Sequence, residues 1–204
     1  MRRKMENIQQ YLTQEIGNVQ NVDTQKVIVN VKKEELLNKL KINDLAILSG
    51  NNADEKLIGI VTKVSKKSID FNDTEVDEES LLEYSYNFCN ITLVGTFYSK
   101  ISPTQNNIFK RAVNTYPEIN SPVFLADDDA LYMIMNSLTN NQSHGKELKI
   151  GKYASNQSVE AILDGNKFFQ RHAAIVGSTG SGKSFSVANI LEKTNALEYS
   201  NIII

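Results

Sequence analysis

The chain has 204 residues, of which 41% are hydrophobic and 23% are charged, so it has the composition of a globular protein with one or two domains. Its 22 basic and 24 acidic side chains nearly cancel, and net charge therefore does not indicate a nucleic-acid-binding protein. A single cysteine, Cys89, excludes an intrachain disulfide and a cysteine metal cluster. We expect Cys89 to be a small buried residue and the protein to be cytoplasmic. No run approaches the roughly 20 apolar residues that span a bilayer, and polar residues such as Glu6 and Asn7 do not fit a signal peptide.

The first half of the chain is dominated by short segments rich in Val, Ile, Thr and aromatic residues. Polar turn residues separate them, and this pattern predicts a small β-barrel or sandwich. The predicted strands cover 26–31, 44–48, 56–64 and 88–98. Between the first two, residues 32–41 carry leucines at helical spacing and predict a short amphipathic helix.

An acidic run lies between Asp70 and Glu83, with seven acidic residues and no basic one. We interpret it as a solvated loop, and the alternative is a docking surface for a basic partner.

A domain boundary is predicted where the three prolines, Pro103, Pro117 and Pro122, fall within twenty residues of one another. Proline donates no backbone hydrogen bond, which suits a connector better than a central strand. A strand at 122–126 is expected next, and then a helix in which Asp127 to Asp129 supply the cap and favourable charge.

Two strands, at 147–154 and 158–164, are predicted beyond a polar loop at 136–146. His144 in that loop has no companion ligand nearby, so we do not predict a metal site there. The segment 172–177 contains apolar residues in succession, as in a strand of a parallel sheet that is covered on both faces.

The next residues fit the phosphate-loop pattern G-x-x-x-x-G-K-[S/T]. The predicted nucleotide-binding residues are Gly177, Ser178, Thr179, Gly180, Ser181, Gly182, Lys183 and Ser184. Glycines let backbone N–H groups point at phosphates, and the positive end of a following helix adds to the attraction. Lys183 would reach the β and γ phosphates, and the Ser184 hydroxyl would coordinate Mg²⁺. Residues 183–194 can form that helix, with Val187, Ile190 and Leu191 facing the sheet.

Hydrolysis also needs a second carboxylate for Mg²⁺, a group that positions water and often an arginine finger. None of these can be assigned in 171–204, although 201–204 has the composition of a further strand. We therefore assign no catalytic residue and expect little or no turnover by these 204 residues alone.

The order of these features resembles the HerA family of bacterial and archaeal ATPases, within the HerA/FtsK group. The resemblance rests on "TYPEINSPVFLA", "KIGKYASNQSVEAILD" and "RHAAIVGSTGSGKS" after an N-terminal β domain. It implies a mixed fold, in which a small β-barrel of the HAS type at 10–102 and a proline-containing connector at 103–122 precede the start of an α/β RecA-like P-loop NTPase core at 123–204. Arg171 and His172 match a basic–His pair common before the family's loop, for which we expect a structural role.

The resemblance also implies a function. Family members form homohexameric rings that use ATP and Mg²⁺ to translocate double-stranded DNA, with no membrane partner. Their barrels dock nucleases such as NurA, or effectors that act in antiviral defence. The first alternative is a non-catalytic module for ring assembly or effector docking. The second is an ABC-type ATPase, since "GSTGSGKS" also resembles that family's loop, but about 170 residues precede the loop here and an ABC domain normally begins some tens of residues before it.

Overall fold

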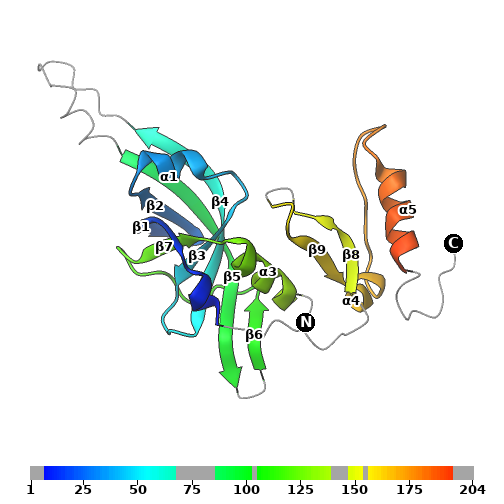
Figure 1. The fold of residues 1–204 in the computed structure, drawn as a ribbon, viewed down its shortest axis with the longest axis horizontal. Helices are drawn as coiled ribbons and strands as arrows, with labels where there is room; N and C mark the ends of the chain where they lie inside the picture. Colours follow the sequence, from blue (N-terminus) through cyan, green and yellow to red (C-terminus); the bar gives the residue numbers. More distant parts are fainter. Residues whose placement is uncertain (1–6, 68–85, 103–104, 139–146, 154–155, 195–204) are drawn as a thin grey trace, which may run out of the picture. The chain divides into compact units, whose positions relative to one another are not determined.

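We analysed a computed structural model, which describes residues 7–67, 86–102, 105–138, 147–153 and 156–194. The chain divides into two compact units, residues 1–130 and residues 131–204 (Figure 1). No helix in the described part of the chain is long and apolar enough to cross a membrane. The acidic run at 70–83 and His144 lie outside the described residues.

The first unit is built around one antiparallel sheet. Its strands are β1 (Gln14–Asp23), β2 (Lys26–Val31), β3 (Leu45–Ser49), β4 (Glu55–Lys67), β5 (Tyr86–Ser102), β6 (Gln105–Lys110) and β7 (Pro122–Leu125). The sheet order is β2-β1-β7-β3-β4-β5-β6, and β2 also pairs with β5. This last pairing closes six strands into a barrel, to which β6 is attached through β5 alone. The predicted small β-barrel is therefore confirmed.

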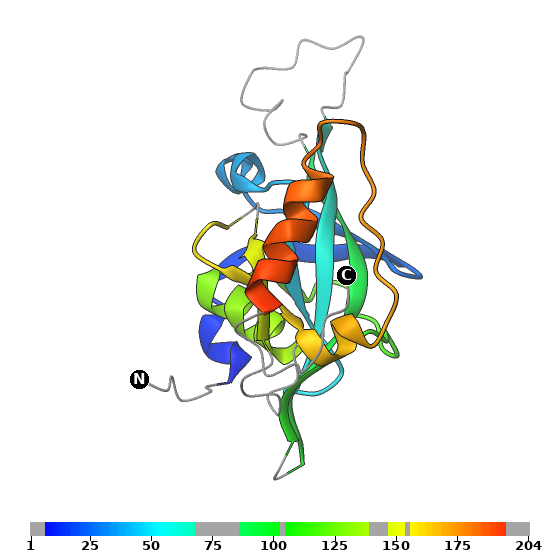
Figure 2. The same ribbon diagram turned by 90° about the vertical axis from the view of Figure 1, so that its right-hand side faces the viewer.

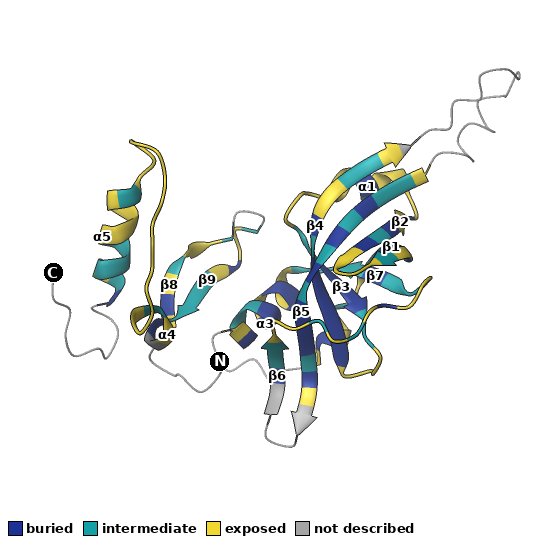
Figure 3. Ribbon diagram, turned by 180° about the vertical axis from the view of Figure 1, so that it is seen from behind, coloured by how far each residue is buried: buried dark blue, intermediate teal, exposed yellow. Residues whose placement is uncertain are grey.

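The barrel interior follows from the alternation of side chains along each strand. In β2, Val27, Val29 and Val31 are buried while Lys26 and Asn30 are exposed. Cys89 of β5 is fully buried in the same core, as the sequence predicted. Burial raises the pKa of its thiol to about 12, which leaves it unreactive at neutral pH. Figure 3 shows the buried positions concentrated in the barrel strands.

Two additional segments pack against this core. Helix α1 (Glu34–Lys39), confirmed where a short helix was predicted, contributes the buried Leu37, and Leu40 follows it. The segment after β6 adds Val113. It is fixed by two hydrogen bonds, from Thr96 Oγ1 to the Ala112 carbonyl oxygen (2.8 Å) and from Thr115 Oγ1 to Glu55 Oε1 (2.9 Å).

The strand pairing of the barrel contains register shifts and one close approach of two backbones. The β1–β2 register shifts between Val19 and Asn21, and the β4–β5 register shifts between Ile58 and Gly59. A Cβ atom added at Gly17 would overlap the carbonyl oxygen of Asn30 on the neighbouring strand. Only glycine allows this close approach of two backbones.

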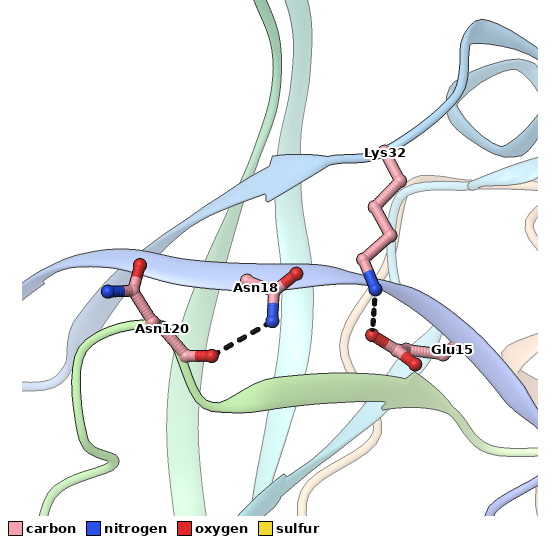
Figure 4. Close-up of polar contacts among 4 residues, drawn as sticks. All are labelled: Glu15, Asn18, Lys32 and Asn120. Carbon is pink, nitrogen blue, oxygen red and sulfur yellow. Dashed lines mark hydrogen bonds and ion pairs between the residues drawn. The ribbon is translucent and has the colours of Figure 1, made fainter.

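Polar contacts tie β1 to its neighbours (Figure 4). The Lys32 ammonium and Glu15 Oε1 form an ion pair at 2.5 Å. Asn18 Nδ2 donates to the carbonyl oxygen of Asn120 at 2.9 Å. Asn120 has φ +66°, so it lies in the left-handed region that a turn into β7 requires. These contacts fix the segment preceding β7 next to β1.

Strand β7 pairs with both β1 and β3, so it forms part of the barrel wall. A strand was predicted here, but residues from 123 onward were assigned to the second domain. We propose a domain boundary near Ala130, where the chain passes from the first unit to the second. The predicted strands also omitted β1 and β6, because β1 carries few apolar residues and β6 is largely polar.

Helix α3 (Asp128–Leu138) begins where the aspartates predicted it, because the Ala130 N–H donates to Asp127 Oδ1 at 2.8 Å. In the second unit, β8 (Glu147–Lys152) and β9 (Glu160–Asp164) form an antiparallel hairpin. Helices α4 (Gly165–Phe169) and α5 (Lys183–Thr194) follow. Two of the predicted strands and the helix after the phosphate loop are thus confirmed.

The predicted strand at 172–177 was wrong. These residues form neither helix nor strand in the structure, and Val176 is 88% exposed. An extended segment becomes a strand only when a neighbour accepts its backbone hydrogen bonds, and none of the described strands pairs with it. The parallel sheet of a RecA-like core is therefore not formed by the described residues of this unit.

Candidate phosphate-binding site

The predicted phosphate loop lies on an exposed segment between α4 and α5. Residues 171–182 are all exposed, and the chain turns from this segment directly into α5 (Figure 2). Gly177 to Gly182 belong to the loop, whereas Lys183 and Ser184 are the first two residues of the helix. The structure therefore brings all eight predicted residues into one turn at the helix N-terminus.

The second and third motif glycines both adopt left-handed backbone conformations. Gly180 has φ +82° and Gly182 has φ +85°, a region that side-chain-bearing L residues rarely occupy. A Cβ atom added at either position would have no neighbour within 4 Å. The need for glycine at these positions therefore comes from the backbone angle and not from crowding.

The Lys183 side chain folds back over the loop. Its ammonium group donates to the carbonyl oxygens of Gly177 (2.9 Å) and Ser178 (2.6 Å). The Ser181 N–H donates to the same Ser178 carbonyl at 3.2 Å. The lysine charge is thus held above the loop backbone, close to the N–H groups of the same turn. A phosphate group bound at this turn would therefore meet both an ammonium group and backbone N–H donors.

Helix α5 presents its N-terminus to the same place. Its first hydrogen bond runs from the Ser186 N–H to the Gly182 carbonyl oxygen at 2.9 Å, and the Ser186 hydroxyl donates to that oxygen at 3.1 Å. The first N–H groups of a helix have no partner within the helix, and the helix dipole makes this end positive. Ser184 is exposed here, with its hydroxyl available to a ligand.

These residues fit a nucleoside triphosphate with Mg²⁺. The loop offers an ammonium group, backbone N–H groups and a hydroxyl, all at one exposed turn. Mg²⁺ prefers oxygen ligands and usually keeps several waters, so one serine hydroxyl together with phosphate oxygens is a reasonable ligand set. Bound ATP would supply the phosphoanhydride bond, and the chain's own residues would hold and orient its phosphates.

The side of α5 that was predicted to face a sheet is only partly covered. Thr194 is buried and Ile190 and Leu191 are half-buried, but Val187 is 42% exposed. The helix contacts β8. The prediction for Ile190 and Leu191 agrees with this burial, whereas Val187 lies nearer the exposed end.

Groups for hydrolysis are not assembled around the loop in the described residues. No set of three or more His, Cys, Asp and Glu side chains among them could hold a metal ion. Arg171 and His172 are exposed. Phe185, the residue after Ser184, is 78% exposed and was not predicted to be a site residue. The signal was present in the sequence, since this phenylalanine interrupts an otherwise small or polar side of the predicted helix.

Comparison with known proteins gives two matches. Residues 148–204 match the family model described as "Helicase HerA, central domain". The protein named "Probable helicase MJ1565" of Methanocaldococcus jannaschii is 34% identical over 87 residues, which are 43% of this chain and 15% of that protein. The chain thus spans about 15% of the length of the curated relative that it matches.

The family match covers β8, β9, the exposed loop and α5, and it includes two of the three segments on which the resemblance noted in the sequence rests. The resemblance and the two comparisons agree that residues 148–204 are similar to the central domain of the HerA helicase family.

Proposed function

We propose that the chain is the N-terminal portion of a HerA-type ATP-dependent DNA translocase or helicase. The observation that carries this proposal is the geometry of the loop at Gly177 to Ser184. Two left-handed glycines shape the turn, and the Lys183 ammonium lies over it. The family match, which includes this loop, supports the same assignment.

In this proposal, different residues of the loop bind different parts of Mg²⁺–ATP. Backbone N–H groups of residues 178–182 and of the first turn of α5 cradle the phosphates. Lys183 exchanges its carbonyl partners for the β and γ phosphate oxygens, and Ser184 coordinates Mg²⁺. Lys183 is therefore both part of the loop's own hydrogen bonding and the principal cation for the ligand.

Substitution of Lys183 tests the proposal. Lys183→Ala removes a charge-assisted contact to phosphate, and we expect the affinity for Mg²⁺–ATP to fall by about tenfold or more. Lys193→Ala is the matched control, because it removes the same charge from the last turn of the same helix. Isothermal titration calorimetry would report both affinities. Equal affinity of Lys183→Ala and the unaltered chain for ATP would contradict the proposal.

The assembly and partners of the parent protein are further parts of the proposal. A homohexameric ring would translocate double-stranded DNA, and the barrel would dock a nuclease or an antiviral effector. Native mass spectrometry with and without Mg²⁺–ATP would test the ring, and a DNA-dependent rise in ATP turnover by the parent protein would test translocation. A strictly monomeric protein at high concentration under both conditions would contradict the ring.

A non-catalytic module for ring assembly or effector docking is the second candidate. It is favoured by one observation: the barrel closes on itself within residues 1–130 and has its own core. Such a module needs no nucleotide for association. Oligomers or effector complexes that form equally well with Lys183→Ala and without ATP would support this candidate over the motor.

A further inference from the structure

Phe185 is the most exposed aromatic side chain in the described part of the chain, at 78%. It is the third residue of α5 and directly follows Ser184. Single exposed apolar residues are common on protein surfaces, but Phe185 directly follows the phosphate loop, where a bound ligand could cover its ring and remove apolar surface from water.

The position of Phe185 on the helix excludes a role in packing α5 against the hairpin. Successive residues of an α-helix are rotated by about 100°, so Phe185 lies on the opposite side of the axis from the buried Thr194. Its neighbours on its own side are Ala188 and Glu192, which are exposed, and Asn189, which is half-buried. The phenylalanine is therefore the only large apolar residue on the open side of α5.

The same rotation places Phe185 relative to the phosphate-binding groups. Lys183 precedes it by two residues and lies about 200° away around the axis, with its ammonium over the Gly177 and Ser178 carbonyls. Helical side chains lean toward the N-terminus, so the Phe185 ring leans toward the loop from the other side. In a nucleoside triphosphate the base and the terminal phosphate are the two ends of the molecule. If Lys183 binds the terminal phosphates, the base can extend toward the side of α5 that carries Phe185.

We propose that Phe185 is the platform on which the base of the bound nucleoside triphosphate stacks. The inference rests on the proposed nucleotide-binding function and adds the part of the site that binds the base. Stacking on an aromatic ring tolerates any base, because every base has a π face. Phe185 thus contributes affinity for nucleotides in general and does not itself select ATP over GTP.

A comparison of two ligands separates base binding from phosphate binding. ATP and inorganic tripolyphosphate share the phosphate chain, but only ATP carries a base. Phe185→Ala should weaken Mg²⁺–ATP binding by at least about fivefold and leave Mg²⁺–tripolyphosphate binding within about twofold of the unaltered chain. Phe169→Ala is the matched control, since Phe169 is also exposed (41%) but precedes the loop. Equal losses for both ligands, or no loss for ATP, would overturn the assignment.

A tryptophan at the same position gives a direct readout. The chain contains no tryptophan, so Phe185→Trp introduces a unique fluorophore while keeping an aromatic face. Its fluorescence should change on addition of Mg²⁺–ATP and not on addition of Mg²⁺–tripolyphosphate. An identical response to both ligands would contradict stacking. If the unaltered chain binds neither ligand, the nucleotide-binding proposal itself fails, and this result is distinct from a failure of Phe185 alone.

Discussion

Replacement of Gly182 by alanine tests whether the backbone angle of the loop is what the ligand requires. Gly182 has φ +85°, and an added Cβ atom would touch nothing within 4 Å. The substitution therefore adds no clash, and its cost is the strain of an L residue in the left-handed region, about 1–2 kcal/mol. If the bound loop needs this angle, the affinity for Mg²⁺–ATP should fall by about 5- to 30-fold.

The same substitution should leave folding almost unchanged, because the loop is exposed and can relax in the free chain. We expect calorimetric titration to show the loss of affinity while circular dichroism and the unfolding transition remain those of the unaltered chain. Gly151→Ala is the control, since it too meets no atom within 4 Å but has no left-handed angle. D-Alanine at position 182, introduced by semisynthesis, should restore binding, because its mirror-image centre favours positive φ. A Gly182→Ala chain that binds ATP as tightly as the unaltered one would refute the reasoning.

Two further predictions concern the barrel. Gly17→Ala should lower the free energy of unfolding by about 1–3 kcal/mol, because the new methyl group overlaps the Asn30 carbonyl oxygen. Urea denaturation would measure this loss, with Gly151→Ala as the control variant. Equal stabilities of the two variants would contradict the prediction. Cys89 should not react with a thiol reagent until the barrel unfolds. Burial raises the pKa of its thiol from 9.0 to about 12, so the folded state retains a proton that the unfolded state loses. This contribution to stability is complete below pH 9, and it falls by up to about 1.4 kcal/mol per pH unit between pH 9 and 12. Cys89→Ala should reduce this loss of stability. Denaturation curves recorded at several pH values would detect the difference.

The barrel was predictable from sequence where burial alternates with the strand period. Val27, Val29 and Val31 show this alternation and form strand β2. Strand β1 was missed because its residues include Asn18, Gln20 and Asn21, which are polar although the backbone pairs on both sides. Register and closure depend on contacts between distant segments, such as β2 with β5, and no local pattern specifies them.

The phosphate loop was predictable for a different reason. Its pattern encodes backbone angles and one lysine within eight consecutive residues, so no distant segment is needed to form the turn. The segment before it, residues 172–177, has the composition of a buried strand, but a strand also needs a pairing neighbour, which local sequence does not provide. Composition therefore identified the apolar character of Ile175 and Val176 but not their exposure.

The two units should respond differently to nucleotide, because only one of them carries the loop. The barrel has a closed sheet and a continuous core, whereas residues 171–182 of the second unit are all exposed. A ligand stabilises the state that binds it by about 2.7 kcal/mol at 100 times its dissociation constant. Mg²⁺–ATP should therefore slow amide hydrogen exchange in the loop and α5 and leave exchange in β3, β4 and β5 unchanged. Uniform protection of both units would show that nucleotide binding is coupled to the barrel, and protection of neither would contradict binding at this loop. Because Lys183→Ala removes the proposed contact and changes no residue of the barrel, it should abolish the local protection and leave the barrel exchange as it was.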